Sequence, residues 1–95
     1  EGGVEVVSTI YLVDSHGTLV GAVPLARIVL ASTSTPMLSL AQEPLILAHE
    51  GVEENEVAEL FDKYNLQTLP VVDERNTLTG VITSDDVISM LRAKL

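Results

Sequence analysis

Hydrophobic and polar positions repeat along this chain in two matching blocks. Residues 12–23 (LVDSHGTLVGAV) align without gaps on residues 71–82 (VVDERNTLTGVI) at a constant offset of 59, and Asp, Thr, Leu and Gly recur in register. Each block holds an apolar run, a polar turn and a second apolar run, with Gly17 or Asn76 at the turn position that tolerates positive φ. Each block therefore predicts a β-hairpin.

Helical spacing of apolar residues follows both hairpins and also precedes the second one. The clearest case is a set at i, i+3, i+4 and i+7, namely Val57, Leu60, Phe61 and Tyr64. The second half of the chain thus predicts a β-α-β-β-α order, with strand 45–49, helix 53–65, strand 69–72, strand 78–82 and helix 84–94.

The repeat divides the chain into two modules. Residues 1–35 form a partial first module with the hairpin and last helix, residues 36–42 a linker, and residues 43–95 a complete second module. Subtracting 59 from Leu45 places the missing first strand before residue 1, so we expect upstream residues to complete module one. The predicted core comprises Leu12, Val13, Leu19, Val23, Ile46, Leu60, Val71, Val72, Val81, Ile82 and Leu91.

Charge and composition restrict the possible functions. Five basic and 14 acidic residues give a net charge of −9, which is the wrong sign for binding nucleic acid, and seven of the acids lie within residues 43–62, so cations are the expected counterpart. The absence of Cys excludes disulfides, thiolate zinc sites and cysteine nucleophiles. The longest apolar stretch, residues 17–31, is shorter than the ~20 residues that span a bilayer, so we expect no membrane insertion of this chain.

Residues 69–73 (LPVVD) and 80–87 (GVITSDDV) resemble the closing half of a CBS (cystathionine-beta-synthase-type) module, and the resemblance covers nearly the whole chain. It implies an α+β CBS-module pair whose first module is truncated at its N-terminus. Residues 60–66 (LFDKYNL) and 83–88 (TSDDVI) are similar to the cytoplasmic CBS pair of MgtE-type magnesium transporters.

The transporter resemblance implies a cytoplasmic regulatory domain of an inner (plasma) membrane protein. Such a domain senses intracellular Mg2+ and gates ion transport through a pore domain outside this chain. The alternative is an adenosine-nucleotide-sensing CBS module that regulates an unrelated enzyme or channel. CBS pairs associate through their helices, which predicts a homodimer with Val87, Met90 or Leu91 exposed at the contact. No strained Gly-x-Ser-x-Gly turn occurs, so we expect no enzymatic activity.

Two residues are candidates for binding an adenosine nucleotide such as ATP. Thr83 and Asp86 lie where the last strand meets the last helix, and the resemblance implies that they contact phosphate and ribose. The same spacing is also a capping box, which is a purely structural role. Module one has Pro24 and Arg27 at these positions, so it lacks both groups. Arg27 could meet a phosphate or pair with neighbouring acids.

Carboxylates at two helix starts are candidate Mg2+ ligands: Glu53, Glu56, Asp85 and Asp86. The helix dipole alone favours acids there, but Mg2+ is also held by one or two carboxylates while it keeps several waters. The transporter resemblance implies further acids at the positions of Asn65 and Ser89. Neutral residues at these two places predict weaker or relocated metal sites.

Overall fold

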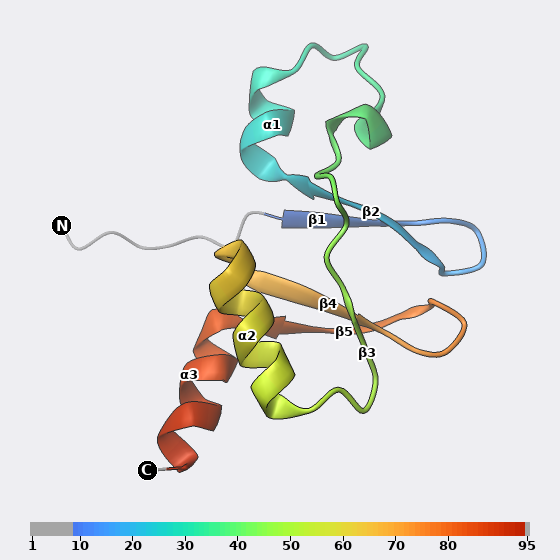
Figure 1. Cartoon of the computed structure of the whole chain (residues 1–95). Coiled ribbons are helices and arrows are strands. Elements are labelled where there is room, and N and C mark those ends of the chain that lie inside the picture. Colours follow the sequence, from blue (N-terminus) through green and yellow to red (C-terminus); the bar gives the residue numbers. More distant parts are fainter. Residues whose placement is uncertain (1–8, 95) are drawn as a thin grey trace, which may run out of the picture.

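The computed structural model describes residues 9–94 as two small sheets flanked by helices (Figure 1). Strands β1 and β2 form one antiparallel sheet, and the other sheet has the order β3-β4-β5, with β3 parallel and β5 antiparallel to β4. The elements are β1 (Thr9–Val13), β2 (Leu19–Pro24), α1 (Leu25–Leu30), a 3-10 helix (Met37–Leu40), β3 (Ala48–His49), α2 (Glu54–Tyr64), β4 (Thr68–Val72), β5 (Leu78–Thr83) and α3 (Ser84–Ala93).

The predicted β-α-β-β-α order of module two and its mixed α+β class are confirmed. Helix α2 ends at Tyr64, and its C-cap Asn65 adopts the left-handed conformation with φ of 53°, which is a common way for helices to stop. The predicted strand 45–49 was too long, because strand pairing covers only Ala48 and His49. The predicted linker contains the short 3-10 helix over Met37–Leu40.

Both hairpins are confirmed, and their tips pair with each other. Gly17 and Asn76 have the positive φ values, 83° and 64°, that their turns require. The Leu19 N–H donates to the Asn76 carbonyl at 2.9 Å, and the Leu78 N–H donates to the Gly17 carbonyl at 3.1 Å. Leu19 and Leu78 are equivalent in the repeat, and so are Gly17 and Asn76. The two hydrogen bonds are therefore equivalent too, and the hairpins make a near-symmetric contact between the modules (Figure 1).

Module two holds its core between α2, α3 and β4. Val57 and Phe61 of α2 pack against Leu69 of β4 and Val87 of α3, and Ala48 of β3 completes the cluster. Helices α2 and α3 lie side by side and run in opposite directions (Figure 1). The Lys94 ammonium lies 3.3 Å from the Glu54 carboxylate, which places the end of α3 beside the start of α2.

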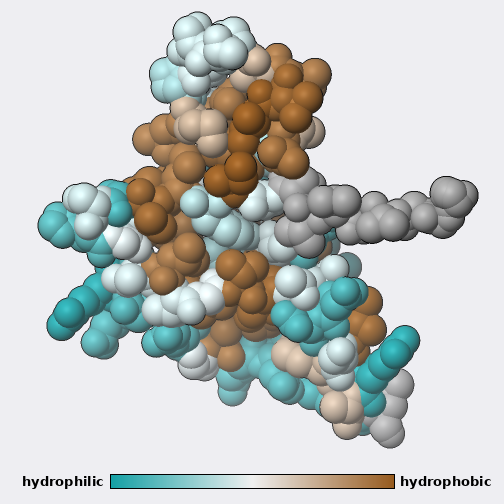
Figure 2. All heavy atoms as spheres, turned by 180° about the vertical axis from the view of Figure 1, so that it is seen from behind, coloured by the Kyte–Doolittle hydropathy of each residue, from teal (hydrophilic) through white to brown (hydrophobic). Residues whose placement is uncertain are grey.

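Some core predictions were wrong. Val13, Val81 and Leu91 are exposed, and Val87, which we had expected at an exposed dimer contact, is buried. Successive strand residues face opposite sides of a sheet, so Val81 points away from the side on which Ile82 packs against the core. Helix α1 has no buried residue at all. Figure 2 shows the resulting apolar surface over the upper half of the molecule, where module one lies.

Candidate functional site

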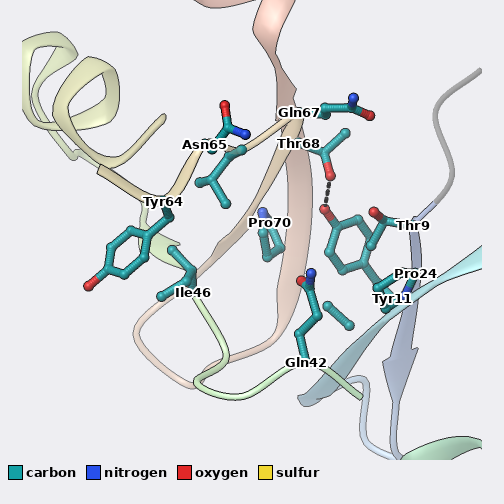
Figure 3. Close-up of a pocket in the computed structure, with 12 residues that line it drawn as sticks. Thr9, Tyr11, Pro24, Gln42, Ile46, Tyr64, Asn65, Gln67, Thr68 and Pro70 are labelled. Atoms are coloured by element: carbon teal, nitrogen blue, oxygen red, sulfur yellow. Dashed lines mark hydrogen bonds between the residues drawn. The ribbon is translucent and has the colours of Figure 1, made fainter. Parts of the chain in front are cut away.

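A cavity of about 240 Å³ lies between the two modules (Figure 3). Module one contributes residues of β1 and β2, and module two contributes the end of α2 and the start of β4. The cavity is lined by Thr9, Tyr11, Ala22, Pro24, Gln42, Ile46, Tyr64, Asn65, Leu66, Gln67, Thr68 and Pro70. A ligand held here would contact both modules at once.

A side-chain hydrogen bond crosses the cavity wall from one module to the other. The Tyr11 hydroxyl bonds to the Thr68 hydroxyl, and the two residues are 57 positions apart in the sequence. Burial raises the pKa of Tyr11 above its ordinary value of 10.0, and the bond to Thr68 partly offsets this rise. The phenol therefore stays neutral at physiological pH and can donate or accept a hydrogen bond.

A backbone hydrogen bond holds Gln42 at the cavity. Its N–H donates to the Ala22 carbonyl at 2.8 Å, which fixes the linker against β2. Its side-chain amide points from the linker toward the space between Pro70 and Tyr11 (Figure 3). An amide offers a donor and an acceptor side by side, which suits the edge of a purine base.

Thr83 and Asp86 form the capping box that the sequence left open as an alternative. The Asp86 N–H donates to the Thr83 hydroxyl at 3.2 Å, and the Thr83 N–H donates to the Asp86 carboxylate at 3.0 Å. Neither residue belongs to the cavity lining. Their contact with a nucleotide remains a prediction.

The equivalent positions of module one behave differently. Pro24 lines the cavity and precedes α1 without a side-chain cap. The Arg27 guanidinium donates to the Leu40 and Ala41 carbonyls at 3.1 and 3.2 Å. One nitrogen of the guanidinium thus bonds to the carbonyls of the 3-10 helix and its C-cap, while both alternatives for Arg27, a phosphate and a neighbouring acid, stay predictions.

The four candidate metal ligands are divided between two places. Glu53 and Glu56 lie at the start of α2, whereas Asp85 and Asp86 lie at the start of α3, beside the other end of α2. A helix of ten residues is about 15 Å long, so one ion cannot reach both pairs within one chain. Within residues 9–94, no three His, Asp or Glu side chains gather where they could hold a metal ion.

Sequence reasoning missed the cavity residues Tyr11, Thr68 and Gln42. One signal was available, because Thr9 and Thr68 are also related by the offset of 59. Extending the aligned blocks by three residues would have included both. No comparable signal marks Gln42, which reaches the cavity only because the linker is fixed to β2.

A family model described as the CBS domain matches residues 39–93. The chain is 33% identical over 90 residues to the magnesium transporter MgtE of Thermus thermophilus, covering 95% of this chain and 20% of that protein. It is 29% identical over 87 residues to MgtE of Bacillus subtilis, covering 92% and 19%. The chain thus spans about a fifth of the length of these relatives.

Solved structures show the same likeness. The cytosolic domain of the Mg2+ channel MgtE in complex with ATP superposes with a TM-score of 0.84 at 32% identity, covering 90% of this chain and 35% of that one. A CBS domain pair in complex with 5'-methylthioadenosine and S-adenosyl-L-methionine has a TM-score of 0.76 at 31% identity, covering 94% and 73%. Across residues 9–94, no helix combines the length and apolar character that crossing a membrane requires.

Proposed function

This chain belongs to the CBS domain family, and from that premise we propose that it is the cytoplasmic regulatory domain of a magnesium transporter. The similarity to MgtE proteins over nearly the whole chain carries this proposal. In the proposed parent protein, the domain senses intracellular Mg2+ and biases the opening of a pore that lies outside this chain. The domain itself catalyses no reaction.

The acidic helix starts support Mg2+ sensing only in an assembly. Among residues 9–94, the carboxylates do not gather into a group of three that could hold a metal ion, so in this proposal a second copy or another domain of the parent supplies further ligands. Glu53, Glu56, Asp85 and Asp86 are all exposed to meet them. Carboxylates brought together across such an interface repel one another. A divalent cation bound between them would relieve this repulsion and shift the population toward the associated arrangement.

An assembly of two copies is part of the same proposal. Ile88 and Leu91 of α3 remain exposed, and they lie on the same helix as Asp85 and Asp86. A homodimer through this helix would cover apolar surface and bring carboxylates of two chains near one another. With Val87 buried, the contact falls to Ile88 and Leu91.

The cavity favours a second ligand of the adenosine type. It is built from both modules, and solved CBS relatives are complexed with ATP or with other adenosine compounds. Gln42 would bond to the base edge, and Pro70 and Ile46 would pack against it. A ligand that bonds to the hydroxyl of Tyr11 or Thr68 would compete with the hydrogen bond between them. Ligand binding would in this way alter the contact between the two modules.

Melting temperatures in two salts test Mg2+ sensing. Millimolar MgCl2 should raise the melting temperature by a few degrees more than NaCl of equal ionic strength, because a site stabilises by mass action whereas screening acts in both salts. The double variant Asp86→Asn with Glu53→Gln should lose the difference. Its control, Glu43→Gln with Glu74→Gln, removes the same charge elsewhere and should keep it.

Sedimentation in the same two salts tests the assembly. The dimer fraction should rise in MgCl2 and fall back in the Asp86→Asn, Glu53→Gln variant. Equal melting temperatures and a monomer in both salts would refute Mg2+ sensing by this domain.

A further inference from the structure

We propose that the paired hairpin tips act as a hinge between the modules, and that the hydrogen bond between Tyr11 and Thr68 is a catch that holds this hinge closed. A swing about the tips changes how module one lies relative to α3, the helix that carries Asp85 and Asp86. The motion requires no bound ligand, because it follows from the places at which the two modules touch.

Contact between the modules is thin. Within residues 9–94, the helices and strands of module one contact those of module two only sparsely, whereas β1 lies along β2 and β4 along β5. The core cluster around Phe61 contains residues of module two alone. Residues 43–47, which lead from the linker to β3, belong to no helix or strand. A contact without a shared apolar core allows the modules to rotate against each other.

The hairpin tips provide the pivot. The Leu19 and Leu78 N–H groups each donate to a carbonyl in the turn of the other hairpin. Beside these hydrogen bonds, an isolated β-bridge pairs Thr18 with Thr77. All of these pairings join the modules at the same end of their strands (Figure 1). Backbone pairing at one end keeps that end together while the rest of each sheet can move, which is the arrangement of a hinge.

The bond between Tyr11 and Thr68 lies away from this pivot (Figure 3). Thr68 begins β4, and the strand runs about 13 Å from there to Val72, next to the second turn. The bond is also one-sided, because its repeat equivalent would join Pro70 to Thr9 and a proline has no hydroxyl. The modules can therefore swing apart on this side only when the bond between Tyr11 and Thr68 breaks.

Burial makes the closed arrangement depend on this bond. Thr68 is 8% exposed, so its hydroxyl relies on Tyr11 rather than on solvent when the modules are closed. Without the phenol, the Thr68 hydroxyl stays buried and loses this partner in the closed arrangement, whereas opening lets water reach it. Removal of the Tyr11 hydroxyl should therefore shift the population toward the open arrangement.

Pulsed electron spin resonance on the 95-residue chain measures the swing. The chain has no Cys, so the exposed positions Leu30→Cys on α1 and Glu59→Cys on α2 place one spin label on each module. Dilution with unlabelled chain restricts the signal to distances within one chain. Tyr11→Phe should add a longer distance and raise the ratio of open to closed molecules about fivefold, as expected for one lost hydrogen bond. Thr68→Val should act in the same way. Tyr64→Phe, which removes the other tyrosine hydroxyl at the cavity wall, should leave the distances unchanged.

Hydrogen exchange of the Leu19 and Leu78 amides distinguishes a hinge from complete separation of the modules. Both amides should stay as protected in Tyr11→Phe as in the unmodified chain, because the tips remain paired while the modules swing. Faster exchange at both amides would overturn the hinge. Unchanged distances in Tyr11→Phe and Thr68→Val would overturn the catch, and so would an equal response to Tyr64→Phe.

Discussion

The two modules contain the same hairpin, yet they bury it differently. Leu69 of β4 is 0% exposed, whereas its equivalent Ile10 of β1, 59 residues earlier, is 40% exposed. Val72 and Val13 are related in the same way, at 0% and 48%. The strands carry similar apolar residues, so the difference comes from what surrounds them. Only module two has β3 and α2 among the described residues to cover its sheet.

The backbone shows the same contrast. In module two, β3 pairs in parallel with β4, and the Glu50 N–H donates to the Val72 carbonyl at 2.8 Å. In the part of the chain that the structure describes, β1 pairs only with β2. Helix α1 exposes Val29 at 74% and Leu30 at 86%. A hairpin of this type therefore needs a strand-helix unit beside it before its apolar residues contribute fully to stability.

Truncating the equivalent residues measures this contrast directly and should give the largest effect. Leu69→Ala should lower the free energy of unfolding by about 3 kcal/mol, because it opens a cavity in the α2–α3 core. Ile10→Ala should cost about 1 kcal/mol, because its side chain is already partly in water. Urea denaturation of both variants measures the difference. Equal losses would show that module one buries Ile10 as fully as module two buries Leu69.

The helices that follow the two hairpins, α1 and α3, also differ, and the expected effect on stability is smaller. Helix α3 has ten residues and a capping box, whereas α1 has six and no side-chain cap. Thr83→Ala should therefore lower the free energy of unfolding by about 1 kcal/mol. Thr83→Ser retains the hydroxyl and should keep most of this stability in the same urea experiment. If the Ser and Ala variants were equally destabilised, the cap hydrogen bond would not be the cause.

Much of the fold could be predicted from local sequence pattern. The hairpins, helices α2 and α3 and the positive φ at Gly17 and Asn76 follow from periodicity and turn chemistry, which depend on neighbouring residues. Burial was predicted less well, because it depends on distant elements. Val87 was expected to be exposed and packs against α2, while Val13 was expected to be buried and is exposed, with no strand of the described residues other than β2 paired to β1.

The candidate site was harder to predict for the same reason. Thr83 and Asp86 share a local motif, and the sequence correctly offered the capping box as one of its two meanings. The cavity joins Tyr11 to Thr68, and no local pattern relates residues that far apart. The metal candidates were grouped by residue type and by helix start, but the opposite directions of α2 and α3 separate them. Spacing along the chain does not reveal this arrangement.

The hairpin turns give the smallest and most specific prediction. The Asp73 carboxylate accepts hydrogen bonds from the backbone N–H groups of Thr77 at 2.9 Å and Arg75 at 2.8 Å. These bonds, first that from Thr77, lower the pKa of Asp73 below its ordinary value of 3.8, and the Arg75 charge adds a smaller part. Bonds of this kind favour the ionised carboxylate.

Because the folded state lowers this pKa, the ionised Asp73 contributes stability above pH 3.8, and that contribution is lost as the pH falls through the lower pKa of the folded state. Asp73→Asn should therefore reduce the urea midpoint at neutral pH and make it fall less steeply in acid. Arg75→Ala should leave most of the acid dependence in place, because it keeps both backbone donors. An Arg75→Ala variant as flat as Asp73→Asn would instead assign the effect to the guanidinium charge, and the turn hydrogen bonds would not be its cause.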